Sequence, residues 1–155
     1  VEEPGLWHRY FNDMLVLLRL LATRVLPYAL YLRHHPASQG ELAAATVEII
    51  ESAHASVICC RGAWSAQNID HLRPGFKQTA ARSCDIELNM AQVTHVDSAF
   101  IGLTMLLYKH QLRQGKRLAI TGLPQRVDEI FRWNCAEFLC GVPIVVYEPI
   151  DEAGS

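Results

Sequence analysis

One feature constrains the fold of this chain most: a strand-like run is followed by a helix-like run, and the pair Asp97-Ser98 joins them. Residues 85–90 alternate apolar and polar side chains, as a strand with one buried face does. Asp97 and Ser98 then precede a run to Gln114 with helical periodicity. The first turn of a helix leaves backbone N–H groups without partners. We therefore predict that Ser98 caps this helix, and that those N–H groups would hold a phosphate placed on its hydroxyl.

Strand-like and helix-like runs alternate along the chain from Thr46 onward. The predicted strands are 46–50, 56–60, 84–90, 117–121 and 142–147. Gly62 is expected to end the second of them. The predicted helices are 66–82 (bent at Pro74-Gly75), 99–114 and 124–133. The expected buried face of the helix 99–114 consists of Ile101, Met105, Tyr108 and Leu112. A strand pair followed by αβ repeats predicts an α/β fold, in which helices pack on a mixed sheet.

Composition restricts the class of protein. Half of the 155 residues are apolar, which is enough for the core of one domain, and the formal charge of −2 gives no basic field for nucleic acid. The five cysteines are odd in number and form no C-x-x-C pair, which is typical of small buried side chains in a reducing compartment. We therefore expect a cytoplasmic chain that binds no nucleic acid. Because it begins at Val1, we also expect a piece of a longer protein.

Residues 1–36 differ from the rest and are predicted to form an amphipathic helical segment. A helix is expected from Leu6 to Leu26, with Pro27 interrupting it. Arg19 and Arg24 argue against a membrane span, since each would be costly at mid-bilayer. Two alternatives remain open: the segment packs on an upstream domain or a second subunit, or it lies on the inner face of the cytoplasmic membrane. The residues predicted to make either contact are Trp7, Arg9, Tyr10, Arg19 and Arg24.

The apolar stripe of this segment predicts self-association of the isolated chain through residues 6–32, as a dimer. Residues 37–44 are predicted to be a linker, 45–150 the α/β domain and 151–155 a tail. Neither a metal site nor a cofactor is expected, because the histidines lack the spacing of metal ligands. The histidines weighed for this are His34, His35, His54 and His71.

Three local motifs, in order along the chain, resemble the STAS domain of bacterial anti-sigma factor antagonists. They are the strand Ile86-Glu87-Leu88 running into Val96-Asp97-Ser98, the turn and strand from Gly115 to Gly122, and the amphipathic helix from Pro124 to Phe131. The similarity extends from Thr46 to Tyr147. The resemblance implies a STAS-like mixed sheet with helices packed on it, preceded here by the amphipathic helical segment.

The same resemblance implies a non-catalytic regulatory module that binds a protein partner: an anti-sigma factor, a kinase-like protein or a host-enzyme domain. In that family the Ser after the Asp is phosphorylated by a partner kinase, which abolishes partner binding, and Ser98 occupies this position. The family continues with a second hydroxyl residue and Gly-Leu-Gly, so that Phe100 in this chain is expected to make the docking surface bulkier and more apolar. The residues predicted to bind the partner are Asp97, Ala99, Phe100 and Gly102.

A shorter resemblance concerns the N-terminal segment. Residues from Glu3 to Tyr10, with the Leu/Arg-rich helix behind them, resemble the C-terminal tail of WecB/TagA/CpsF-type glycosyltransferases, which is associated with membrane attachment. It implies that the chain ends a longer polysaccharide-assembly enzyme. The alternative function is therefore a membrane-associated accessory domain of a glycosyltransferase, or of a lipid-transport system with a STAS subunit. An enzyme that binds a small ligand near Trp64 and Ser98 is ranked last.

Overall fold

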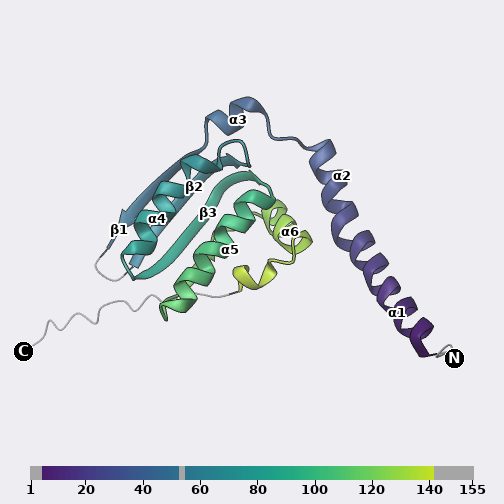
Figure 1. Ribbon diagram of the computed structural model, residues 1–155. Coiled ribbons are helices and arrows are strands. Elements are labelled where there is room, and N and C mark those ends of the chain that lie inside the picture. The colour runs from purple at the N-terminus through teal and green to yellow at the C-terminus, as the bar shows by residue number, and fades with distance from the viewer. Residues whose placement is uncertain (1–4, 53–54, 142–155) are drawn as a thin grey trace, which may run out of the picture.

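A four-stranded sheet forms the centre of the fold, with the strands in the order β1-β2-β3-β4 (Figure 1). The computed structural model describes residues 5–52 and 55–141, with side chains from Asn12 onward. β1 is antiparallel to β2, whereas β2, β3 and β4 run parallel. The bounds of the strands are β1 Thr46–Glu51, β2 Ala55–Trp64, β3 Asp85–Val96 and β4 Leu118–Thr121. The predicted α/β fold with a mixed sheet is confirmed, while the predicted strand 142–147 lies outside the described residues.

Helices cover the buried face of this sheet. The bounds are α4 Arg73–Ala81, α5 Ser98–Arg113 and α6 Gln125–Trp133, with short 3-10 turns at η2 Ile69–His71 and η3 Glu137–Cys140. In Figure 1, α4 and α5 lie side by side in front of the sheet. Over the first six residues of β2 and of β3 every second residue is buried, among them Ile58, Ile86 and Leu88, and these side chains form the core with the helices. α4 begins later than predicted because Pro74 stands in its first turn, where a missing N–H costs nothing.

Two glycines allow close approaches that a side chain would block. β2 does not end at Gly62 as predicted, because this residue adopts a φ of +79° and the strand continues to Trp64 with a shift in register. Gly122, which follows β4, has a φ of +64°, and a Cβ added there would lie 2.8 Å from the Cβ of Ala91. Each position therefore requires glycine for its backbone conformation and for its space.

The buried stripe of α5 differs from the predicted one. Of the predicted face, Ile101 is buried, but Leu112 is 63% exposed. Thr104 and Gln111 are buried instead, because both find partners: the Thr104 hydroxyl donates to the carbonyl of Phe100, and Gln111 Nε2 donates to a backbone carbonyl beside β3. The prediction was wrong because it required every buried position to be apolar.

The N-terminal helix continues through Pro27, contrary to the prediction. α1 (Gly5–Leu20), the π-helical turn η1 (Leu21–Val25) and α2 (Leu26–His34) form one long helix that projects from the domain (Figure 1). The Leu26 N–H bonds to the carbonyl of Leu21, five residues back. This wider turn brings the chain to Pro27, which has no N–H to contribute and stands in the first turn of α2.

The predicted linker contains a short helix, α3 (Gln39–Ala43). Ser38 and Glu41 form a reciprocal cap: the Glu41 N–H donates to Ser38 Oγ at 3.2 Å, and the Ser38 N–H donates to the Glu41 carboxylate at 3.0 Å. Leu42 is buried, and its carbonyl accepts a hydrogen bond from Asn68 Nδ2. The segment that joins the long helix to β1 is therefore fixed to the domain.

Candidate functional site

Asp97, rather than Ser98, caps α5. Its Oδ1 accepts hydrogen bonds from the N–H groups of Ala99 at 2.8 Å and Phe100 at 3.2 Å. Its Oδ2 accepts the N–H of Ala66, in the loop after β2, at 2.8 Å. The prediction that Ser98 caps the helix is wrong, because the side chain one position earlier reaches the N–H groups two and three residues ahead.

Ser98 is the first residue of α5, and its side chain is exposed, so the hydroxyl is accessible as the phosphoacceptor prediction requires. Its own N–H donates to the hydroxyl oxygen of Tyr28 at 2.9 Å. The first three N–H groups of the helix are thus occupied by Asp97 and Tyr28. The expectation that these groups stand ready to hold a phosphate is therefore corrected: an anion would have to displace one of the two side chains.

Aromatic side chains surround the contact between Tyr28 and α5. The ring of Tyr31 stacks on the His95 imidazole with centroids 5.8 Å and planes 10° apart, and its hydroxyl lies 3.4 Å from His95 Nδ1. The rings of Tyr28 and Tyr31 lie 6.5 and 5.5 Å from the ring of Trp133 in α6. The sequence analysis missed these residues, because no local pattern links positions so far apart in the chain.

Burial in this cluster changes the titration of two side chains. It lowers the pKa of His95 below its ordinary 6.5, although the carboxylates of Asp97 and Glu41 oppose the shift. Burial also raises the pKa of the Tyr31 hydroxyl above 10.0. Both shifts favour the neutral forms, so the cluster holds a neutral imidazole against a neutral phenol near pH 7.

Arg24 contacts the domain of its own chain. Its guanidinium donates to the Glu137 carboxylate at 3.1 Å and to the carbonyl of Arg132. Arg24 is thus engaged within its own chain, while its side chain stays 31% exposed and its predicted contact with a membrane or a second subunit stays a prediction. Arg19 is exposed, and its predicted contact stays a prediction. The side chains of the other predicted contact residues, Trp7, Arg9 and Tyr10, lie outside the described part of the chain.

Of the four residues predicted to bind the partner, three lie at the surface and one lies in the core. Asp97, Ala99 and Gly102 are partly exposed, and a Cβ added at Gly102 would meet nothing within 4 Å. Phe100 is 0% exposed, so its proposed role on the docking surface is wrong. It belongs to the core because it is the first buried residue of α5, on the face of the helix that packs on the sheet.

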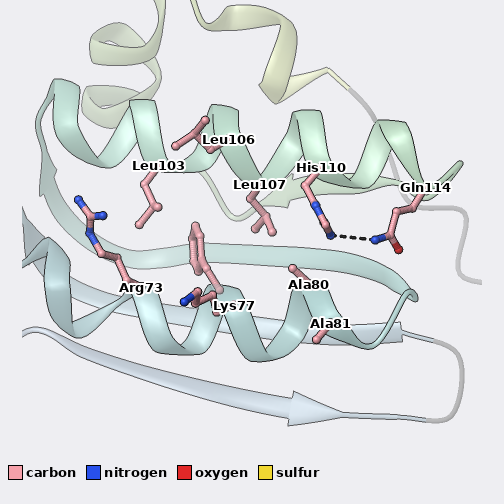
Figure 2. A pocket seen from close by; sticks show the side chains of 10 residues that line it. Arg73, Lys77, Ala80, Ala81, Leu103, Leu106, Leu107, His110 and Gln114 are labelled. Atoms are coloured by element: carbon pink, nitrogen blue, oxygen red, sulfur yellow. Dashed lines mark hydrogen bonds between the residues drawn. The ribbon is translucent and has the colours of Figure 1, made fainter.

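A groove of about 530 Å³ runs between α4 and α5 (Figure 2). Leu106 on its wall is 66% exposed, and His110 is hydrogen-bonded to Gln114 at 2.9 Å at one end. The other lining residues are Arg73, Phe76, Lys77, Ala80, Ala81, Leu103 and Leu107. The groove offers an apolar surface that the sequence analysis missed, because Leu103 and Leu106 fall outside the stripe it expected to be buried.

The small-ligand site expected near Trp64 and Ser98 is not formed as one hollow. Trp64 is 1% exposed, and its Nε1 has no hydrogen-bond partner among the described residues. It lines a hollow of about 410 Å³ together with Leu42, Asn68 and His71, and Ser98 is not among the residues that line it. Within residues 5–52 and 55–141, no three His, Cys, Asp or Glu side chains are grouped to hold a metal ion.

The long N-terminal helix meets a simple criterion for crossing a membrane. The helix Asn12–His34 is 23 residues long and contains an 18-residue window with a mean hydropathy of 1.6, which suffices by length and composition alone. Core helices of soluble proteins and signal sequences meet the same criterion. The second half of this helix contacts the domain through Arg24, Tyr28 and Tyr31.

Comparisons with known proteins agree with this fold. The family described as "Mlab, STAS domain" matches residues 47–134, more than half of the chain. The anti-sigma factor antagonist SpoIIAA in its unphosphorylated form has a similar structure, with 15% identity, a TM-score of 0.54 and coverage of 63% of this chain and 85% of that chain. Phosphorylated SpoIIAA, from Bacillus, gives 14% identity, a TM-score of 0.50 and coverage of 63% and 88%.

An anti-sigma factor antagonist from Mycobacterium paratuberculosis is similar as well, with 11% identity, a TM-score of 0.54 and coverage of 66% of this chain and 88% of that chain. At such identities the likeness concerns the fold. Among curated protein sequences there is no significant match.

Proposed function

This chain belongs to the STAS domain family, and from that premise we propose that it is a regulatory protein-interaction module switched by phosphorylation of Ser98. The observation that carries the proposal is the exposed hydroxyl of Ser98 on the first residue of α5, directly after the capping Asp97. SpoIIAA, which shares the fold, is an anti-sigma factor antagonist that occurs in phosphorylated and unphosphorylated forms. By this likeness the partner is an anti-sigma factor, a kinase-like protein or a host-enzyme domain, and the module acts by binding rather than by catalysis.

The charge of a phosphoryl group explains how the switch would work. It adds about −1.5 to −2 charges next to the carboxylate of Asp97. Because Asp97 and Tyr28 occupy the first N–H groups of α5, the phosphate gains the Ser98 N–H only by displacing Tyr28. The added charge would repel an acidic partner surface and would lose its hydration against an apolar one. We therefore expect phosphorylation to weaken partner binding.

Substitutions of Ser98 in the full chain test this switch. An acidic side chain in the first turn of a helix is compatible with folding, so Ser98→Asp adds charge without unfolding α5, and Ser98→Asn gives the same shape without the charge. Partners captured from host lysate by the wild-type chain are first identified by mass spectrometry and then quantified for each variant. We expect capture by Ser98→Asp to fall about tenfold or more, and capture by Ser98→Asn and Ser98→Ala to stay near wild type. Equal capture by all chains would exclude a switch at this residue.

A second candidate function is a membrane-associated accessory domain of a glycosyltransferase or a lipid-transport system. The observation that favours it is a set of exposed apolar side chains on α1 and η1: Met14, Leu15, Val16, Leu17, Leu18, Leu20, Leu21 and Val25. Flotation of the full chain with anionic liposomes, compared with a variant carrying Gln at positions 17, 18 and 21, tests it. Equal flotation would remove this candidate. Light scattering of the same two chains tests the predicted self-association through residues 6–32.

A further inference from the structure

The N-terminal helix lies on the surface that carries Ser98, and three side chains on one helix face hold it there. Arg24, Tyr28 and Tyr31 follow each other at spacings of four and three residues, so they point the same way. No residue of η1 or α2 is buried, but the half-buried rings of Tyr28 and Tyr31 pack against the edge of the core. The helix is therefore held by polar contacts and by these two aromatic rings.

One of these side chains satisfies a backbone group that a helix end leaves unpaired: the hydroxyl of Tyr28 accepts the N–H of Ser98 at the start of α5. The guanidinium of Arg24 donates to the Glu137 carboxylate and to the carbonyl of Arg132 in the last turn of α6, which also accepts the Cys135 N–H. Tyr31 stacks on His95. The surface thus recognises a helix that presents a donor, an acceptor and an aromatic ring at fixed spacing.

The contact between the long helix and α6 is small and lies at the surface. Open hollows of about 620 and 440 Å³ flank it, the first lined by Arg24, Arg132 and Trp133 among others and the second by Tyr31, Arg126 and neighbouring residues. Such limited and partly polar contacts between parts of one chain resemble transient protein–protein interfaces. A contact of this kind can be exchanged.

We propose that the surface made by His95, Ser98, Trp133 and Glu137, here called the helix-receiving surface, binds an α-helix of a protein partner in place of the segment formed by η1 and α2. The partner helix carries an Arg with tyrosines four and seven residues later on the same face. The segment of η1 and α2 is then a competitor built into the chain. The inference rests on the proposed function, since it names the kind of partner that the Ser98 surface takes, but it does not depend on phosphorylation.

A fluorescent peptide of residues 22–35 of this chain is the probe, because it carries all three anchors. It is titrated against the full wild-type chain and against the full chain with Tyr28→Ala and Tyr31→Ala, in which the helix-receiving surface is unchanged. A tethered helix competes at an effective concentration of about millimolar. We therefore expect the peptide to bind the double variant at least about tenfold more tightly than the wild type. The same peptide with Ala at both tyrosine positions should not bind either chain.

The Ser98 N–H is tested by a matched pair of substitutions in the double variant. Ser98→Pro removes the N–H at the first helical position, where proline is accepted, and Asp97 before it already has the extended backbone that proline requires. Ser98→Ala keeps the N–H. Peptide binding should weaken severalfold with Pro and stay unchanged with Ala, while circular dichroism confirms that each chain is folded.

Three results of the peptide titration would overturn the inference. They are equal peptide affinity for the wild type and the double variant, equal binding of the peptide with and without its tyrosines, and no binding to the double variant at about 1 mM peptide. A wild-type dimer that exchanges α2 between copies, and that becomes monomeric in the double variant, would make a second copy the occupant and would also overturn it. Loss of the Ser98→Asp effect on partner capture, with peptide binding intact, would count against the phosphorylation switch alone.

Discussion

Removing the carboxylate of Asp97 should destabilise the fold more than removing any exposed carboxylate of the chain. Its two oxygens accept three backbone N–H bonds, two within α5 and one from Ala66 after β2. Loss of a helix N-cap typically costs about 1 kcal/mol. A hydrogen bond to a charged group contributes about 1.5–3 kcal/mol when buried, and we use the lower end because Ala66 is exposed. Asp97→Ala should therefore lower the free energy of unfolding by about 2–3 kcal/mol.

Thermal and chemical unfolding of the full chain measure this cost. For a domain of this size, about 2–3 kcal/mol corresponds to a fall in Tm of roughly 6–9 °C. Asp97→Asn should cost only about 1.5 kcal/mol, because the amide oxygen still accepts the two N–H bonds of α5 while the amide nitrogen cannot accept from Ala66. Hydrogen exchange should accelerate at the amides of Ala66, Ala99 and Phe100 in the Ala variant.

A matched control separates the cap from the general loss of a negative charge. Asp70 pairs with Arg73 at 2.9 Å on the surface, and its side chain is 83% exposed, so Asp70→Ala should change stability by no more than about 0.5 kcal/mol. If Asp97→Ala is as mild as this control, or if Asp97→Asn costs as much as Asp97→Ala, then the three N–H bonds do not stabilise the junction of β3 and α5 as argued.

Three further predictions concern the backbone, the histidine and the contact with the long helix. Gly122→Ala should destabilise by about 2–3 kcal/mol, and Gly115→Ala, with a similar positive φ but open space around it, by only about 1 kcal/mol, as urea unfolding will measure. Because burial lowers the pKa of His95, the unfolded chain takes up this proton first on acidification. Stability should therefore fall below about pH 6.5, and the slope should be smaller in His95→Gln than in the wild type. In a double-mutant cycle of Ser98→Asp and Tyr28→Phe, followed by hydrogen exchange in residues 24–34, the Asp should loosen the helix less when the tyrosine hydroxyl is already absent. A cycle without coupling would mean that charge at Ser98 does not compete with Tyr28.

Much of the order of strands and helices could be predicted, because β2 and β3 begin with apolar alternation and because glycines mark the turns after α5 and β4, at Gly115 and Gly122. The resemblance to STAS domains, based on three motifs, is confirmed by the family match over residues 47–134. The resemblance of residues 3–10 to a glycosyltransferase tail finds no support in the comparisons. The buried stripe of α5 could not be predicted, because Thr104 and Gln111 lie in the interior through hydrogen bonds that depend on tertiary structure.

The position of Ser98 after a strand was enough to predict an accessible hydroxyl, but it could not predict which group accepts the Ser98 N–H. Tyr28 stands 70 residues earlier and reaches α5 only because η1 carries the helix past Pro27 without a break. A helix ended at Pro27, as predicted, would leave the start of α5 open to any anion. With Tyr28 in place, a phosphate on Ser98 and the long helix draw on the same backbone donor. Two ligands that share one donor oppose each other by the same free energy in both directions. Partner binding at this surface and docking of the N-terminal helix should therefore form one coupled equilibrium. A change in the free energy of either should change the other by the same amount.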